Sequence, residues 1–569
     1  MAGGLVKAAS LADVQRDGPV VAHVDGHTLA IFAADGQVYA VDNRCPHMGF
    51  PLHRGSCRGG ILTCHWHHAR FDLETGGTFD PWADDLRTFP VEIRDGEVWI
   101  DPRPRLDVKE HQRKRLRDGL ERNLPLVIAK AVIVLDDEPV EAVRIGLEFG
   151  SRYRETGWGQ GLTILACMTN LLPVLEPDDR RRALYHGLSA VAVESFAEAP
   201  RFPLRPLPGS TAPAPTLKRW FRQFVEVRDA EGAERCLVSA VRAGCTPEQL
   251  ADMLFAAATD HRYIQIGHVL DFSNKALEAL DAAGWDLAET VLPSLARGLA
   301  DAPRMEESNA WRHPVDLVAI LERAFAELPT ATGSGEWEGR IELVETVLGD
   351  DPQAIADSLL HALRSGAGAV ELASAVSYAA TLRIARFPTS NEFGDWDTAL
   401  HTFTFANAVE QGLRRSPSEE LLRGVFDSAM SVYLDRFLNV PAKRLPDPEP
   451  GAEPAALLGD LTALLDRQQQ VDEAGWLVAS YLGAGGDPDP LLARLGHALL
   501  REDRDFHTIQ TVEGTFRQFG RLRGSQEGTN VLVACARYLA AHAPTVRSQE
   551  QTFDIAARLH RGERLYEEA

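Results

Sequence analysis

Residues 45–68 read CPHMGFPLHRGSCRGGILTCHWHH and hold three cysteines and five histidines in 24 positions. The whole chain of 569 residues has only 7 Cys and 18 His, so this stretch concentrates metal-ligating side chains. Cys45 and His47 form a C-x-H pair, and Cys64 and His67 form a C-x-x-H pair further on. Two thiolates and two imidazoles in two short loops suit either a tetrahedral zinc site or a two-iron cluster.

The spacing and the flanking sequence separate these alternatives. Zinc knuckles usually place two cysteines on one turn, whereas each loop here mixes one Cys with one His. The first loop continues as HMGFPLHRG and the second as HHARFDLETGGTFDPWADDLRTFPVEI. With these motifs, residues 1–102 closely resemble the Rieske [2Fe–2S] family, and the alternating segments HTLAIFA, QVYAVD and VEIRDGEVWI match half-buried strands. The resemblance implies an all-β fold and four cluster ligands, which are Cys45, His47, Cys64 and His67.

The resemblance also implies properties of the cluster. The family's glycines and its proline loop fall at Gly49, Gly55, Gly76, Gly77 and Pro81. High-potential members join the ligand loops by a disulfide, but Phe50 and Trp66 stand at those positions here. They also donate hydrogen bonds to the cluster from Ser and Tyr hydroxyls, which Ala69 and Phe71 replace. With fewer donors we expect a low potential, toward the negative end of the family's range of about −150 to +300 mV.

The remaining histidines and cysteines of the stretch have ordinary interpretations. We expect His53, His65 and His68 to be loop or surface residues, and Cys57 to be a small buried or turn residue. An odd number of mostly isolated cysteines argues against a disulfide framework.

Composition limits the location and the partners of the chain. A net charge of −23 disfavours binding to nucleic acid and to anionic membrane surfaces. No run of 18 apolar residues is present, which predicts no membrane span. The first residues, MAGGLVKAASLADVQ, lack the apolar run of a signal peptide, so we expect a cytoplasmic protein.

The rest of the chain follows a different period. Residues 103–124 are strongly charged and are expected to form a linker or an exposed helix. Residues 125–569 repeat apolar side chains at i, i+3, i+4 and i+7, interrupted by Pro-rich loops at 201–216 and 440–454. The sequence therefore predicts a multidomain protein, with an N-terminal all-β domain followed by a large all-α domain.

The helical region repeats one pattern about three or four times. Each copy has a helix ending in small residues and Gly, a polar turn, a second helix, and a third helix opening with His. The three clear copies begin at Glu234, Ala356 and Trp476. Their aligned histidines are His268, His401 and His507, and a degenerate first copy has Thr163 at this position. Because stacked repeats place equivalent positions around one centre, we expect the three histidines to meet in one cavity.

Carboxylates accompany these histidines. Asp397 precedes His401 by four residues, and Asp503 precedes His507 by four if its helix begins that early. Asp271 follows His268 by three residues, and His261 precedes it by two helical turns, whereas Glu513 is a poor match for the face of His507. His and Asp on helix faces suit a mononuclear non-haem iron. Alternatively, the histidines are satisfied locally at helix N-termini beside Asp N-caps, or they line a pocket without metal.

Two short segments of the helical region resemble known families. AVRAGCTPEQLADML is similar to the helix and turn of carboxymuconolactone-decarboxylase-like proteins, although the redox C-x-x-C of their peroxidase relatives is absent. HRYIQIGHVLDF resembles a segment of questin-oxidase-like proteins, a helical family linked to Baeyer–Villiger oxygenation of polyketides. The H-x₄₋₅-H motif of ring-hydroxylating Rieske oxygenases is not found. Neither a G-x-G-x-x-G nor a Walker loop is visible, so we expect electrons from a separate reductase.

Together these features predict an oxidoreductase of the Rieske type. Electrons would enter at the exposed edge formed by His47 and His67 and pass to catalytic residues His268, His401 and His507. Oxygenation of a small organic substrate, as a mono- or dioxygenase, is expected by analogy with Rieske oxygenases. Alternatively, the chain is a redox sensor or electron carrier whose helical repeats are a binding scaffold, or the helical domain catalyses metal-free chemistry. Convergence of the three histidines in a pocket would count against the scaffold.

Overall fold

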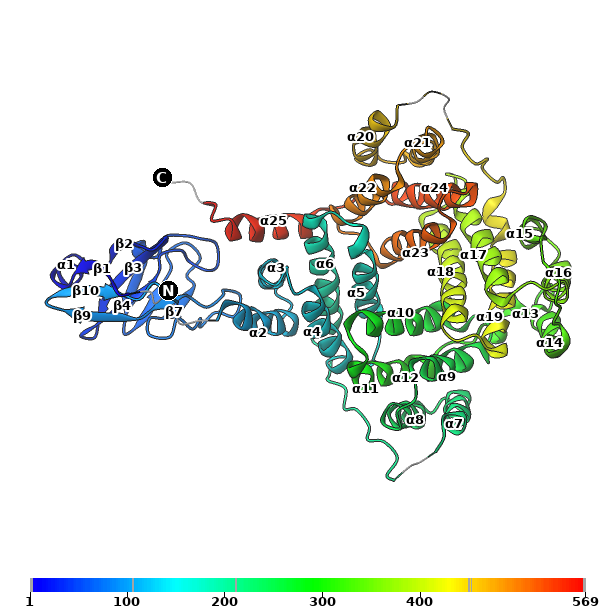
Figure 1. Cartoon of the computed structure of the whole chain (residues 1–569), viewed down its shortest axis with the longest axis horizontal. Coiled ribbons are helices and arrows are strands. Elements are labelled where there is room, and N and C mark those ends of the chain that lie inside the picture. Colours follow the sequence, from blue (N-terminus) through cyan, green and yellow to red (C-terminus); the bar gives the residue numbers. More distant parts are fainter. Residues whose placement is uncertain (1–3, 105–106, 210–211, 449–450, 452, 566–569) are drawn as a thin grey trace. The chain divides into compact units, whose positions relative to one another are not determined.

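The computed structural model describes residues 4–104, 107–209, 212–448, 451 and 453–565. Contacts divide the chain into two compact units, which are residues 1–145 with 549–569, and residues 146–548. The first contains the β-strands and the second is helical (Figure 1). The predicted β domain followed by a large helical region is therefore confirmed. None of the helices in the described ranges is long and apolar enough to cross a membrane.

The strands of the first unit form three antiparallel sheets. One sheet has the order β1 (Val6–Ser10), β10 (Glu97–Ile100) and β9 (Val91–Arg94). The second has the order β2 (Val20–Val24), β3 (His27–Ala34), β4 (Gln37–Asp42) and β8 (Thr88–Phe89). The third has the order β5 (Ser56–Arg58), β6 (Ile61–Thr63) and β7 (Arg70–Asp72). The first Cys/His loop lies between β4 and β5, and the second joins β6 to β7.

Asp-Gly turns fix the register of the hairpins. The turn between β3 and β4 is Asp35–Gly36, with φ of 51° and 79°, so that Ala34 pairs with Gln37. Positive φ at both central residues defines the tight hairpin turn whose twist matches the strands, and Asp-Gly is favoured there. Alternation along β3 then buries Leu29 and Ile31 on one side of the sheet and Ala30 and Phe32 on the other.

Helices complete the first unit. They are α1 (Leu11–Asp17), α2 (Val108–Glu121), α3 (Pro125–Val134) and α25 (Ser548–His560), while α4 (Pro139–Arg152) crosses the division. The segment 103–124, expected to be a linker or an exposed helix, thus contains α2, which begins at the N-cap Asp107. Polar side chains on one face of α2 are buried, among them His111, Gln112 and Arg115. Residues 105–106 lie outside the described part of the segment.

The second unit is built from helices alone. In chain order they are α5 (Gln160–Leu171), α6 (Pro177–Ser195), α7 (Ala214–Glu226), α8 (Ala230–Arg242), α9 (Pro247–Thr259), α10 (His268–Ala283), α11 (Ala288–Val291), α12 (Ala296–Asp301), α13 (Asn309–Arg312), α14 (Leu317–Glu327), α15 (Arg340–Val347), α16 (Pro352–Arg364), α17 (Ala369–Ala385), α18 (Phe393–Arg415), α19 (Glu419–Leu434), α20 (Pro454–Leu465), α21 (Val471–Gly483), α22 (Pro488–Leu500), α23 (Phe506–Leu522) and α24 (Gln526–Ala541).

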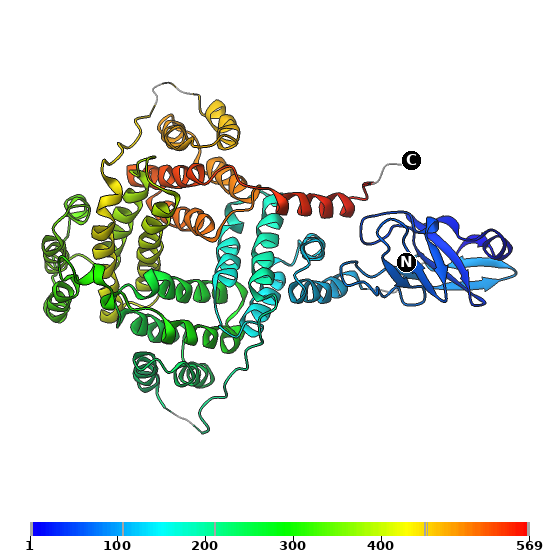
Figure 2. The same ribbon diagram turned by 180° about the vertical axis from the view of Figure 1, so that it is seen from behind.

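Four of these helices form a closed inner ring. Helix α5 packs on α10, α10 on α18, α18 on α23, and α23 on α5 (Figures 1 and 2). Behind them pack α6, α9, α17 and α24, each against the inner helix nearest to it in the chain. The inner helices are those that carry the four aligned positions of the repeat. The repeat pattern thus corresponds to one inner helix with its outer partners.

Two expectations about helix faces are wrong. His261 is not on the face of α10, because Tyr263, Gln265 and Ile266 between them adopt left-handed φ of 43–50°. His261 instead contacts Glu306, with Nδ1 2.8 Å from the carboxylate. Asp503 is not on α23 either, because that helix begins only at Phe506, after the N-cap Asp505.

Candidate metal centres

The two Cys/His loops of the first unit are tight turns of matching geometry. The N–H of Cys45 donates to the carbonyl of Phe50 at 2.8 Å, and the N–H of Cys64 donates to that of Ala69 at 2.8 Å. Both cysteines are buried and lie close enough for a hydrogen bond between their thiols. Glycine is required nearby at Gly76, whose φ is 82° and whose added Cβ would lie 1.9 Å from the carbonyl oxygen of Leu86.

The sulfur atoms are electrostatically suited to bind metal as thiolates. The hydrogen bond from Cys45 lowers the pKa of Cys64 to about 6, against the opposing effect of burial. The backbone N–H groups of Trp66 and His67 contribute to this lowering. The same pair interaction and burial raise the pKa of Cys45. Two thiols that share a proton in this way would lose it to a bound metal ion.

The imidazoles complete the set. The rings of His47 and His67 lie 4.9 Å apart at 84°, and Trp82 of the proline loop packs edge-on against His47 at 4.7 Å. Nδ1 of His47 is buried without a hydrogen-bond partner among the described residues. Burial lowers the pKa of His47 to about 4, so the ring is neutral at pH 7. An unpartnered imidazole nitrogen beside paired thiols fits a [2Fe–2S] cluster with two Cys and two His ligands.

The features expected of a low-potential centre are in place. Phe50 and Trp66 lie with ring centroids 6.1 Å apart, where high-potential members have a disulfide. Ala69 and Phe71 are fully buried and offer no hydroxyl. The other members of the stretch have different surroundings. His53 lies beside Asn43, His65 beside Ser56, His68 is exposed, and Cys57 is a free thiol.

The second unit brings the three aligned histidines together. His268 is the first residue of α10, His401 lies in α18, and His507 is the second residue of α23. One nitrogen from each ring falls within 4.8 Å of the others. Nε2 of His401 and Nε2 of His507 are 3.0 Å apart, and the His268 ring centroid is 4.6 Å from that of His401. The sequence alignment by repeats therefore located a real convergence of side chains.

The surroundings keep two of these rings neutral, and one ring nitrogen has no hydrogen-bond partner among the described residues. Burial and the neighbouring histidines lower the pKa of His401 to about 3 and that of His268 to about 4. Nδ1 of His268 is buried and has no hydrogen-bond partner in the described chain. Neutral imidazoles with free nitrogen lone pairs are the form that binds metal ions. The three rings could hold one transition-metal ion and leave coordination positions open.

A carboxylate lies near one of the rings on the side away from the other histidines. Oδ2 of Asp397 lies 3.6 Å from Nδ1 of His507, although both Asp397 and His401 are on α18. The hydroxyl of Tyr538 donates to Oδ1 of Asp397 at 2.6 Å. Asp397 thus lies near a histidine of the neighbouring helix, while Nε2 of that histidine faces His401. A carboxylate on the distal nitrogen of a metal-binding His is a common supporting interaction.

At the fourth aligned position, on α5, the repeat has a threonine instead of a histidine. Thr163 on α5 is fully buried and accepts a hydrogen bond from the indole N–H of Trp158 at 2.8 Å. Its own hydroxyl donates to the carbonyl of Gly159 at 2.9 Å. A pocket of about 550 Å³ lies beside this corner, and its lining includes Trp158, Gly159, His268 and Phe272. Of the three aligned histidines, His268 is the one that lines this pocket.

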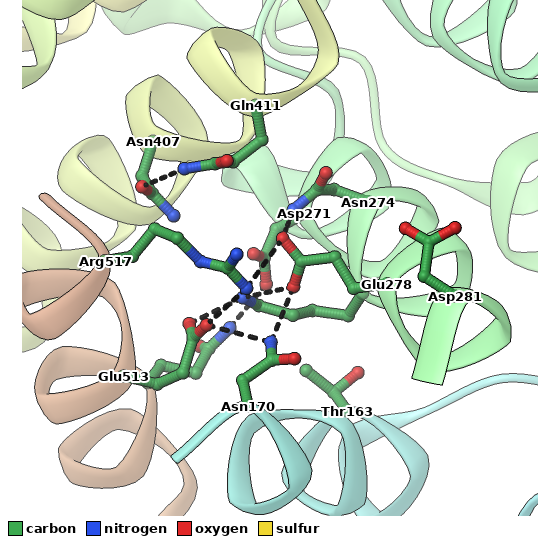
Figure 3. A network of polar contacts seen from close by, with 12 residues as sticks. Thr163, Asn170, Asp271, Asn274, Glu278, Asp281, Asn407, Gln411, Glu513 and Arg517 are labelled. Carbon is green, nitrogen blue, oxygen red and sulfur yellow. Dashed lines mark hydrogen bonds and ion pairs between the residues drawn. The ribbon is translucent and has the colours of Figure 1, made fainter. Parts of the chain in front are cut away.

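Further along the ring axis the inner helices meet in a buried charged network (Figure 3). Nζ of Lys275 lies 2.5 Å from Glu513 and 3.0 Å from Glu278. Asn170 donates to both carboxylates at 2.7 and 2.9 Å. Asp271, one turn after His268, accepts a hydrogen bond from Gln510. Burial raises the pKa of Asp271 to about 7.

Sequence reasoning missed most of this network. The sequence spacing placed Glu513 off the face of His507, and it gave no indication of a role for Lys275. Lys275 faces the ring interior, because it lies seven residues after His268 on the same helix face. Glu513 faces the interior as well, since its carboxylate contacts Lys275. Extending the aligned register by two turns along each helix would have located Lys275 and Asn170 together.

The comparisons with known proteins concern the first unit. A family model of the Rieske [2Fe-2S] domain matches residues 4–90. The ferredoxin component of the naphthalene 1,2-dioxygenase system of Pseudomonas putida is 32% identical over 97 residues, which are 17% of this chain and 93% of that protein. The ferredoxin component of the p-cumate 2,3-dioxygenase system of Pseudomonas putida is 37% identical over 78 residues, which are 13% of this chain and 66% of that protein. The solved Sphingomonas yanoikuyae B1 ferredoxin is 32% identical, with a TM-score of 0.17, over 18% of this chain and 100% of that one.

The sheets and the paired Cys/His loops define an iron–sulfur protein with mixed Cys and His ligation. Through residues 4–90 this chain belongs to the Rieske [2Fe–2S] domain family. The family implies a [2Fe–2S] cluster and one-electron transfer. Each of these matches covers less than a fifth of the chain, so the role of the helical unit must be argued from its own residues.

Proposed function

We propose that this protein is a Rieske-type oxidoreductase whose helical unit binds one mononuclear non-haem iron at His268, His401 and His507. The observation that carries the proposal is the convergence of three imidazoles, one nitrogen of each lying within 4.8 Å of the others. Their separate origins on α10, α18 and α23 argue against a local structural role at each helix start. The unpartnered Nδ1 of His268 is the kind of buried atom that a ligand would satisfy.

Iron is the metal we favour. Imidazole ligands suit iron, zinc, copper and nickel, so the ligand set alone does not choose among them. The Rieske centre supplies electrons one at a time, and of these metals zinc has no redox chemistry. A mononuclear iron with open coordination positions supplies oxygen-activating chemistry. The ligand atoms of this chain would fix its position, and Asp397, which Tyr538 holds by a hydrogen bond, would support the ring of His507.

We further propose that the substrate is a small organic molecule bound in the pocket beside His268. Aromatic and aliphatic side chains line part of that pocket, including Trp158, Phe272 and Leu299. A pocket of about 550 Å³ is of the size that holds such ligands. The reaction class is oxygenation, in keeping with relatives that are ferredoxin components of dioxygenase systems. Electrons would come from a separate reductase.

The test follows electrons out of the reduced Rieske centre. Full-length protein is reduced without oxygen and mixed with aerated buffer, and the cluster absorbance is followed during reoxidation. We expect His401→Ala to slow oxygen-dependent reoxidation at least about tenfold, because the metal that accepts the electrons is lost. His361→Ala is the matched control, since His361 is exposed on α16 in the same repeat copy. Equal rates in all three proteins would contradict the proposal and favour an electron carrier or redox sensor.

A further inference from the structure

Two cations of the α2–α3 hairpin reach the loops that surround the Rieske site. Nζ of Lys130, on α3, donates to the carbonyl oxygens of Pro46 and His47, both at 2.6 Å. Nη2 of Arg115, on α2, donates to the carbonyl oxygens of Pro81 and Ala83, both at 2.7 Å. The first pair of carbonyls belongs to the first ligand loop and the second pair to the proline loop. The hairpin therefore contacts the cluster site from both sides with charged groups.

The charges of the two cations are balanced differently. Arg115 lies 3.2 Å from Asp84 and 2.9 Å from Asp118, so carboxylates neutralise it directly. His111 and Gln112 also bind Asp84, each at 2.7 Å. Lys130 has no ion pair with a carboxylate in the described ranges, and its two hydrogen bonds go to neutral carbonyls. Its positive charge is therefore directed at the ligand loop without a direct counter-ion.

Lys130 is also part-buried at these two contacts. A lysine side chain ordinarily carries its positive charge at pH 7. In a setting shielded from water a fixed charge acts over a longer range than it does at the surface.

We propose that Lys130 is a positioning and tuning residue that raises the reduction potential of the Rieske centre. Reduction adds one negative charge to the cluster, and a nearby fixed cation stabilises that charge more than it stabilises the oxidised form. Lys130 would thereby offset part of the loss of hydroxyl donors at Ala69 and Phe71. The matched family segment ends at residue 90, so this cation is an addition made by the helical hairpin. The inference does not depend on the proposed iron site of the second unit.

Three substitutions in the full-length protein separate charge from structure. Lys130→Gln removes the charge but keeps an amide donor for the carbonyls, and Lys130→Arg keeps the charge. Lys114→Gln is the matched control, because the Lys114 side chain on α2 is 68% exposed. The measurement is the midpoint potential in a titration monitored by the EPR signal of the reduced cluster, with iron and sulfide content recorded for each protein.

We expect Lys130→Gln to shift the midpoint to more negative values by about 59 mV, a tenfold change in a one-electron equilibrium. Lys130→Arg should retain most of the wild-type potential, and Lys114→Gln should match the wild type. A fully loaded Lys130→Gln protein with the wild-type midpoint would overturn the inference. An equal negative shift in Lys130→Arg would overturn it as well, because the charge would then not be the cause. If Lys130→Gln does not load its cluster, Lys130→Met provides the charge-free comparison at the same site. If neither variant loads a cluster while Lys130→Arg loads normally, the tuning role is overturned in favour of a folding role.

Discussion

At the scale of single residues, the contact between His401 and His507 is the most informative feature of the helical unit. Their Nε2 atoms are 3.0 Å apart, so either one ring donates a proton to the other or both ligate one ion. Asp397 beside Nδ1 of His507 favours a proton on that nitrogen, which leaves the Nε2 lone pair free.

Asp397→Asn tests this arrangement. We expect the variant to bind the metal about 10 to 100 times more weakly, the usual effect of removing a carboxylate behind a His ligand. Competition with a chelator, followed by metal analysis, measures the change. Asp357→Asn is the control, because Asp357 is exposed on α16 and contacts only Gln353 among the described residues. Unchanged affinity in Asp397→Asn would show that Asp397 does not orient His507.

Asp271 predicts a pH dependence of stability. Its folded pKa is raised to about 7 by burial, above the ordinary value of about 3.9 in the unfolded chain. Its contribution to the free energy of unfolding is therefore fully present below about pH 4 and is lost as the pH rises through about 7. Asp271→Asn removes this dependence. The free energy of unfolding of the metal-free variant, relative to that of metal-free wild type, should therefore be about 1–3 kcal/mol higher at pH 8 than at pH 5. Urea unfolding at the two pH values measures the difference, and parallel curves for the two proteins would contradict it.

The residues of the two sites were predictable to different degrees. Cys45, His47, Cys64 and His67 were found from spacing, because all four lie within one short stretch of chain. The histidines of the second unit were found through the repeat, since equivalent positions of repeats meet at one centre. Asp397 was noticed for the wrong partner, because its contact with His507 joins helices that are distant in sequence. The contact of Lys130 with the first ligand loop could not be predicted from the sequence, since the two segments are distant along the chain and meet only in the folded structure.

At the scale of elements, the inner ring is held by buried charges as well as by apolar packing. Lys275 on α10 joins Glu278 of the same helix to Glu513 of α23. Burial opposes the charged form of Glu278, but Lys275 and Arg517 outweigh it and lower the pKa to about 2. Asn170 of α5 ties a third helix to the same carboxylates. These contacts thus link α5, α10 and α23 of the inner ring (Figure 3).

Lys275→Met tests the contribution of this network. Removing the ammonium leaves two buried carboxylates without their main cation, and breaking a buried pair in this way costs about 3–5 kcal/mol. We expect a destabilised helical unit with weaker metal binding, measured by thermal unfolding and metal content. Lys443→Met serves as the control, since Lys443 is 41% exposed in its ion pair with Asp472. A Lys275→Met protein as stable as the control would mean that the charges are dispensable.

Apolar periodicity in the sequence predicts the presence of the helices better than it predicts their first residues. The helices of the repeat were predicted well, because apolar spacing and Gly-containing turns mark them directly. Helix starts were predicted less well, as Asp503 and His261 show. A left-handed turn at Tyr263, Gln265 and Ile266 has no marker in residues of these types, which rarely adopt that conformation. The charged run at 103–124 hid the buried face of α2, since burial there depends on the partner Asp84.

At the scale of the whole molecule, the chain combines a Rieske unit with a helical unit that holds a candidate metal site. A one-electron donor and a candidate site for oxygen chemistry are therefore encoded in one chain. Iron at His268, His401 and His507 would make the helical unit the site of oxygen chemistry. Without a metal there, the helical unit would be a binding scaffold or a metal-free catalyst.

The most direct measurement is the iron and sulfide content, with EPR, of full-length protein purified without oxygen. We expect three irons for every two sulfides, with a Rieske signal after reduction. His401→Ala should keep the Rieske signal and two irons but lose the third, and His361→Ala should keep all three. Two irons per chain in the wild type, or a third iron that persists in His401→Ala, would contradict the iron site at the three histidines.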